Sequence, residues 1–126
     1  YKNGLQIAQW IAEQPEVTRV MYPALETDPG HQIWKRDFTG ASSLFGFILK
    51  ETDQKKVGAF LDGMEFFGMG SSWGGFESLL IPTFPNGNRS ATEWNHSGQT
   101  LRIHIGLEDP DDLIADLEKG LKRMAG

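Results

Sequence analysis

The segment Leu44–Leu49 constrains the fold most, because it is apolar at every position except Gly46. A run of this kind is typical of a strand that is covered on both faces, and such a strand lies inside a sheet. We therefore expect a central strand here, with other elements packed around it.

Residues 101–107 show a second strand pattern, in which two kinds of side chain alternate. Successive residues of a strand point to opposite faces of the sheet. One face is predicted to carry Leu101, Ile103, Ile105 and Leu107, and the other Arg102, His104 and Gly106. Arg102 is thus expected opposite the core.

The most clearly marked helix follows this strand. Asp109 is a suitable N-cap, Pro110 suits the first helical position, and acidic residues precede basic ones along the segment. Its predicted buried stripe consists of Leu113, Leu117, Leu121 and Met124.

The remaining elements alternate between helix and strand patterns. An N-terminal helix is predicted from Leu5, Ala8, Ile11 and Ala12, with Asn3 and Gln6 as its capping pair. Thr52 is the predicted cap of a helix that buries Val57, Phe60, Leu61 and Met64. Strands are expected at residues 17–22 and 66–73, and a short helix at 31–36. These patterns predict one α/β domain over residues 1–126, with about four strands and helices on one face of the sheet.

Composition excludes several classes of function. A net charge of −5 and the lack of long basic runs argue against a nucleic-acid surface. No apolar stretch approaches the roughly 20 residues of a membrane helix, and no secretory signal pattern begins the chain, so a soluble intracellular protein is expected. The chain begins with Tyr1, which fits either a processed product or an excision from a longer chain.

Three features are candidate site elements. The Gly74-Gly75 turn could present backbone N–H groups to an anion or could simply require positive φ angles. The polar stretch between Pro82 and Thr100 is either a loop near a site or an ordinary surface loop. Arg102 could bind a carboxylate through two parallel hydrogen bonds or pair with a surface carboxylate of the chain itself.

Other chemistry has little support in the sequence. The histidines His31, His96 and His104 lack metal-ligand spacing, so no metal is expected. The sequence contains no Gly-x-Ser-x-Gly motif, so a serine hydrolase is not expected.

Several motifs, in order and over nearly the whole chain, resemble the C-terminal domain of the Cys/Met-metabolism family of pyridoxal-phosphate (PLP) enzymes. They are Pro15-Glu16-Val17-Thr18-Arg19-Val20-Met21-Tyr22-Pro23-Ala24-Leu25, Pro29-Gly30-His31, Lys35-Arg36-Asp37-Phe38-Thr39-Gly40, Leu44-Phe45-Gly46-Phe47, Ser72-Trp73-Gly74-Gly75, Glu77-Ser78-Leu79, Leu101-Arg102-Ile103-His104-Ile105-Gly106-Leu107-Glu108-Asp109 and Asp112-Leu113-Ile114-Ala115-Asp116-Leu117. Trp73 favours the β-lyase branch over the γ-synthase and γ-lyase branches, which commonly carry leucine there. Ser71 departs from the tyrosine that is expected at this position in the β-lyase branch.

The resemblance implies a role for three residues. Arg102 would hold the substrate α-carboxylate, and Ser72 and Trp73 would line the same pocket. Holding the carboxylate orients the Cα–H bond across the plane of the cofactor ring. A β-lyase of this family converts cystathionine to homocysteine, pyruvate and ammonia.

The resemblance also implies that much of the enzyme lies elsewhere. The Schiff-base lysine and the cofactor-binding groups of the family belong to a larger N-terminal domain, and the complete enzymes are homotetramers. We therefore expect the 126-residue chain alone to bind no PLP and to be inactive. A non-catalytic amino-acid-binding module, using Arg102 and the Gly74-Gly75 turn, is the competing hypothesis.

Overall fold

The computed structural model describes residues 1–69, 77–84 and 98–125. Helices and strands alternate along the first half of this part of the chain. The elements are α1 (Lys2–Ala12), β1 (Val17–Met21), α2 (His31–Asp37), β2 (Leu44–Leu49), α3 (Gln54–Asp62), β3 (Leu79–Thr83), β4 (Thr100–His104) and α4 (Pro110–Ala125).

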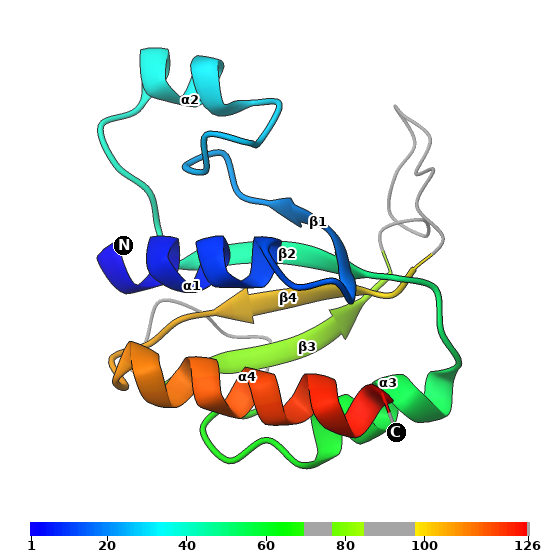
Figure 1. The fold of residues 1–126 in the computed structure, drawn as a ribbon. Coiled ribbons are helices and arrows are strands. Elements are labelled where there is room, and N and C mark those ends of the chain that lie inside the picture. The colour runs from blue at the N-terminus through cyan, green and yellow to red at the C-terminus, as the bar shows by residue number, and fades with distance from the viewer. Residues whose placement is uncertain (70–76, 85–97, 126) are drawn as a thin grey trace.

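The strands form one antiparallel sheet in the order β1-β2-β4-β3 (Figure 1). β2 and β4 are the two interior strands, which confirms the central position expected for Leu44–Leu49. Phe45 lies opposite Ile103 and Phe47 opposite Leu101, so large apolar side chains share one face of the sheet.

Helices α1, α3 and α4 pack their apolar sides on this face and complete the core (Figure 1). Phe47, Phe60 and Ile7 are fully buried there, each from a different element. Burial of one such side chain contributes about 1.5–3 kcal/mol to folding. The α/β class with helices on one face of the sheet is confirmed, while α2 buries no residue and lies away from the sheet.

Helix α4 begins as its sequence predicts. The Asp109 carboxylate accepts a hydrogen bond from the Asp111 backbone N–H at 2.8 Å, and the Leu113 N–H donates to the Asp109 carbonyl at 3.1 Å. The predicted stripe of Leu113, Leu117, Leu121 and Met124 is buried.

The caps of the other two long helices differ from the predicted ones. α1 begins at Lys2, with Tyr1 at the N-cap and no capping side chain, so the predicted pairing of Asn3 with Gln6 is wrong. In α3 the N-cap is Asp53, one residue after the predicted Thr52, and its carboxylate accepts the Lys56 N–H at 2.9 Å.

Three residues that the sequence predicts in the core are exposed or only partly buried in the structure. Ala12 is exposed at the end of α1, where Ile7 is buried instead. Met64 lies beyond the last residue of α3 and is partly buried against the core. Leu107 is 82% exposed, because β4 ends at His104 and the alternation of faces ends with it.

The strand predicted at residues 66–73 is wrong in its described part, residues 66–69, which holds a single bridge between Gly68 and Leu79. The buried Asp116 carboxylate accepts the backbone N–H groups of Glu65 and Phe66 and fixes the chain in a turn there. The remaining strand is β3, which contains Pro82. Proline argues against a central strand, but β3 lies at the sheet edge, where a missing N–H is tolerated.

Candidate functional site

Arg102 lies in the middle of β4, on the face of the sheet opposite the helical core. Its ladder neighbours are Gly46 of β2 and Ile81 of β3. Leu101 and Ile103, on either side of it, are fully buried in the core, so the pleat directs Arg102 the other way. The sequence prediction of its orientation is confirmed, and its side chain is half-buried.

The row that contains Arg102 is otherwise apolar or small. Met21 of the edge strand β1 lies opposite Gly46, so the row runs through Met21, Gly46, Arg102 and Ile81. A Cβ at Gly46 would stand 2.9 Å from the Met21 Cε atom. The ladder neighbours of Arg102 in this row are uncharged.

Polar residues of β4 itself share this face with Arg102. His104 lies between Leu44 and Leu79, and Thr100 lies one pair along in the other direction. Both are buried, with 5% of their surface exposed. Of the two histidines that the structure describes, His31 lies in α2 and His104 lies on the same face as Arg102.

A partly buried hydrogen-bond network joins the residue before β3 to the chain after β4. Glu108 accepts the Ser78 backbone N–H at 3.2 Å and the Ser78 hydroxyl at 2.7 Å. The Ser78 Oγ atom in turn accepts the Gly106 N–H at 2.8 Å. This network links the residue that precedes β3 to the chain that follows β4.

The carboxylate of Glu108 is stabilised by this network. Burial raises the pKa of the Glu108 carboxyl, but the hydrogen bonds from Ser78 and the nearby His104 imidazole outweigh burial and hold the pKa below its ordinary value of 4.5. Sequence reasoning assigned no role to Ser78 or Glu108. Both stood within the quoted motifs, next to Glu77 and Asp109, but their contact across 30 residues of chain has no local signal.

Ser72 and Trp73, the other predicted site residues, lie outside the described residues, as do Gly74, Gly75 and His96. What the structure does describe is the chain on either side of residues 70–76. Gly68 and Ser78 are joined by a backbone hydrogen bond of 3.0 Å, so the two ends of that segment start close together.

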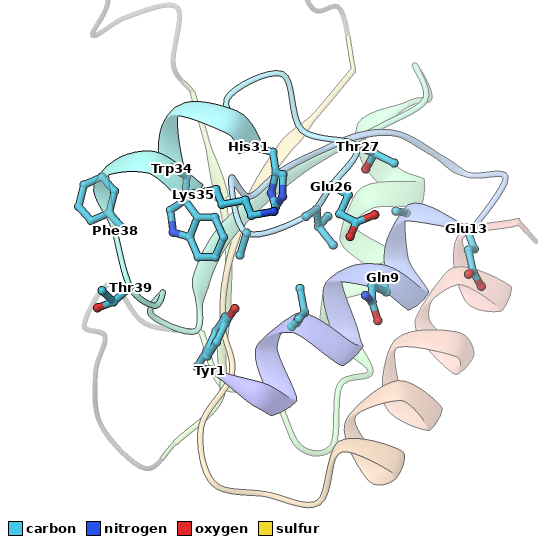
Figure 2. A pocket seen from close by; sticks show the side chains of 14 residues that line it. Tyr1, Gln9, Glu13, Glu26, Thr27, His31, Trp34, Lys35, Phe38 and Thr39 are labelled. Carbon is cyan, nitrogen blue, oxygen red and sulfur yellow. The ribbon is translucent and has the colours of Figure 1, made fainter.

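Arg102 lines none of the cavities described here. One, of about 790 Å³, opens between α1 and residues 24–39 and is lined by Glu13, Glu26, His31, Trp34 and Lys35 among others (Figure 2). A second, of about 400 Å³, lies where the N-terminal end of α1 meets the end of β4, and His104 lines it. Neither cavity is lined by Arg102.

The lysines of the chain do not fit a PLP-binding role. A Schiff-base lysine needs a lowered pKa, which burial or neighbouring charge provides. All seven lysines are exposed, and none lies on a strand: Lys2, Lys35, Lys50, Lys55, Lys56, Lys119 and Lys122. Within residues 1–69, 77–84 and 98–125, no group of three acidic or histidine side chains could hold a metal ion. None of the helices in the same ranges is long and apolar enough to cross a membrane.

Solved structures with the same architecture are PLP enzymes of fold type I. A cystathionine gamma synthase from Xanthomonas oryzae matches with a TM-score of 0.83 and 32% identity, over 98% of this chain and 33% of that one. A putative O-acetylhomoserine (thiol)-lyase from Campylobacter jejuni matches with a TM-score of 0.79 and 29% identity, over 96% of this chain and 28% of that one.

The sequence matches the Cys/Met metabolism PLP-dependent enzyme family over residues 1–122, and the chain belongs to that family. It is 46% identical to the cystathionine beta-lyase of Escherichia coli, over 98% of this chain and 32% of that protein. It is 36% identical to human cystathionine gamma-lyase, over 97% of this chain and 31% of that protein. The chain thus spans about a third of the length of the curated relatives it matches.

Proposed function

We propose that this chain is the C-terminal, substrate-binding domain of a longer PLP-dependent carbon–sulfur lyase, and that the complete enzyme is a cystathionine β-lyase. The observation that carries the proposal is the position of Arg102, half-buried between Gly46 and Ile81 on the face of the sheet opposite the helical core. Family membership and 46% identity to a cystathionine beta-lyase support it.

Arg102 would bind the α-carboxylate of the amino-acid substrate. A guanidinium group offers two parallel N–H donors to the two carboxylate oxygens, which fixes the orientation of the substrate as well as its position. Ser72 and Trp73 would line the same pocket. Tight orientation matters because a reacting bond must be aligned before any group can act on it.

The cofactor would be held mainly by the part of the enzyme that precedes this chain. PLP, when bound there, withdraws electrons from the substrate Cα. The residues of this chain contribute carboxylate binding and orientation, and no step of bond breaking is assigned to them. In the complete reaction, cystathionine and water would yield homocysteine, pyruvate and ammonia.

Assembly and location follow the same proposal. The complete enzyme would be a cytoplasmic homotetramer that acts in methionine biosynthesis by transsulfuration. The chain alone would bind no PLP and catalyse no lyase reaction, because its lysines are all exposed and none lies on a strand.

Two other functions remain alternatives. Identity of 36% to a cystathionine gamma-lyase and 32% to a cystathionine gamma synthase supports a relative that acts at the γ-carbon. A non-catalytic amino-acid-binding module would also use Arg102.

One product analysis separates these functions. The full-length protein, loaded with PLP, is incubated with L-cystathionine, and the products are identified by mass spectrometry. Pyruvate and homocysteine support the β-lyase, while cysteine and 2-oxobutyrate would indicate a γ-lyase. Amino-acid binding without any product would indicate the binding module.

A further inference from the structure

Gly46 leaves a gap in the row of side chains that contains Arg102. Its neighbours Phe45 and Phe47 are buried in the core, so a side chain at position 46 would stand on the same face as Arg102. Glycine places no Cβ there, and neighbouring strands lie only about 4.8 Å apart. The first atoms of the Arg102 side chain therefore border the space over Gly46.

Met21 fills this space from the edge strand β1. It pairs with Gly46, and Val20 before it is buried in the core, so Met21 points to the same face as Arg102. A Cβ at Gly46 would stand 2.9 Å from the Met21 Cε atom, closer than the roughly 3.5 Å at which carbon atoms touch. The Met21 methyl group thus lies over β2, one strand from Arg102.

Ile81 borders Arg102 from the other side. It lies directly opposite Arg102 in β3 and is partly buried. Facing residues of an antiparallel pair have Cβ atoms about 4.5–5.5 Å apart, and the methylene groups of an arginine pack readily along apolar atoms. Met21 and Ile81 therefore provide two apolar sides, between which the Arg102 side chain leaves the sheet.

We propose that Met21 is a positioning residue for substrate binding, which restricts the rotamers of Arg102 by filling the space over Gly46. This inference rests on the proposed function, in which Arg102 binds the substrate carboxylate. An arginine that is already restricted loses less side-chain entropy when its N–H donors engage a carboxylate. Loss of the Met21 side chain would leave Arg102 more rotamers to give up on binding.

The expected effect is limited by the entropy of one arginine side chain. Complete loss of that rotamer freedom on binding corresponds to about thirtyfold in affinity. Met21 borders Arg102 on one side only, so Met21→Ala should raise the KM for cystathionine about threefold to tenfold. The kcat should change less, because the carboxylate is bound in the ground state and in the transition state alike.

A second substitution should return a methyl group to the same space from the neighbouring strand. When Gly46→Ala is combined with Met21→Ala, the new methyl group lies near the place that the Met21 Cε atom leaves. Its next neighbour is the Leu101 carbonyl oxygen at 3.4 Å, an ordinary contact. The double variant should recover most of the wild-type affinity, and a double variant as weak as Met21→Ala would overturn the inference.

The test uses the full-length protein loaded with PLP. Steady-state kinetics with L-cystathionine give kcat and KM, calorimetric titration with L-alanine gives the affinity for a small amino acid, and thermal unfolding gives the stability. Met21→Ala is also made in the Arg102→Leu background. There it should change kcat/KM by less than about twofold, because the side chain that it positions is gone.

Met64 provides a matched control. A Cβ at Gly120 would stand 2.6 Å from the Met64 Cε atom, so Met64 also fills the space over a glycine, but it packs against the helical core. Met64→Ala should lower the thermal midpoint and leave the KM and the L-alanine affinity unchanged. If Met64→Ala weakens L-alanine binding as much as Met21→Ala does, the effect is one of stability and the inference is overturned.

The remaining outcomes are distinct. A raised KM and weaker L-alanine binding in Met21→Ala, without an effect in the Arg102→Leu background, support the inference. If Met21→Ala keeps the wild-type KM and affinity, or acts equally in both backgrounds, the inference is overturned, while impaired catalysis in Arg102→Leu leaves the proposed function standing. A wild type that neither binds L-alanine nor cleaves cystathionine overturns both.

Discussion

At the scale of single residues, Arg102 shows how the pleat of a strand selects a side chain for function. Its neighbours Leu101 and Ile103 must enter the core, so the side chain between them must leave it. Gly46, beside it, adds no side chain to the row. A charge at this position costs little, because the half-buried guanidinium keeps part of its solvation.

Substitution of Arg102 tests this residue directly. In the complete enzyme, Arg102→Leu should lower kcat/KM for cystathionine at least about tenfold, since hydrogen bonds to charged groups contribute about 1.5–3 kcal/mol. Arg102→Lys should recover part of this loss, because lysine keeps the charge without the fork of donors. Arg36→Leu, at an exposed arginine of α2, is the control and should leave kcat/KM unchanged. An unchanged kcat/KM in Arg102→Leu would remove Arg102 from the site.

Replacement of glycine by alanine is expected to have opposite effects on stability at two positions. A Cβ at Gly98 would stand 1.7 Å from the Leu49 carbonyl oxygen, so Gly98→Ala should force the backbone apart and cost about 1–3 kcal/mol or more. A Cβ at Gly58, within α3, meets nothing within 4 Å, so Gly58→Ala should stabilise the fold by about 0.5–1 kcal/mol. Urea unfolding of the two variants measures both effects. Equal stabilities would contradict the close approach of Gly98 to Leu49.

At the scale of elements, the residues that the sequence predicts well are those with strong local signals. Asp109 and Pro110 mark the start of α4, and the start is found where they place it. Asn3 and Thr52 carry the same kind of signal but fail, because Tyr1 and Asp53 lie at the actual helix starts. A one-residue shift of a cap depends on tertiary packing, which a local pattern does not contain.

Elements that depend on distant contacts are the ones the sequence misses. Pro82 weakens the strand pattern of β3, and only the edge position of that strand makes the proline acceptable. Residues 66–69 look strand-like, but Asp116, from α4, bonds to the Glu65 and Phe66 amides and sets a turn. In the candidate site, Arg102 was predictable from alternation, whereas the Ser78–Glu108 contact was not, because it joins segments 30 residues apart.

The hydrogen bonds between Ser78 and Glu108 predict how the stability of the fold depends on pH. The pKa of Glu108 is lowered in the folded state, so its contribution to stability is full above the unfolded-state pKa of about 4.5 and is lost as the pH falls through the lower folded-state pKa. Between pH 5 and pH 3, the unfolding free energy of Glu108→Gln should therefore decline less steeply than that of the wild type. Urea unfolding at a series of pH values measures this slope. The control is Glu118→Gln, because Glu118 is exposed on α4 and its nearest cation, Lys122, is 3.9 Å away. Its unfolding free energy should decline with pH as that of the wild type does. An identical decline in all three proteins would argue against a stabilising role of the Ser78–Glu108 hydrogen bonds.

At the scale of the whole molecule, the chain exposes large apolar side chains outside its core. Ile33 is 58% exposed and Phe38 62% exposed, both at α2, a helix that buries no residue of its own. Phe84 and Leu107 are exposed beyond the ends of β3 and β4. Scattered apolar residues are common on protein surfaces, but if the chain is one domain of a longer enzyme, as proposed, the rest of that enzyme would cover these side chains.

The exposed apolar surface predicts how the isolated chain behaves in solution. The 126-residue chain should bind a hydrophobic dye such as ANS and self-associate as its concentration rises, as measured by fluorescence and by sedimentation. Ile33→Lys combined with Phe38→Lys should reduce both effects without loss of helical signal, since neither residue belongs to the core. Monomeric behaviour without dye binding would contradict the proposal that a larger domain covers this surface.

The same proposal predicts that catalysis needs the longer protein. Native and denaturing mass spectrometry of one purified sample should identify a 14.1 kDa species, and that species should release no pyruvate from cystathionine when PLP is added. The physical reason is that all seven lysines are exposed, so none has the buried setting that activates a Schiff-base lysine. The full-length protein under the same conditions is the positive control. Pyruvate release by a verified 14.1 kDa preparation would mean that the chain is catalytic by itself, while a co-purifying larger fragment with a PLP adduct would indicate a nicked but assembled enzyme.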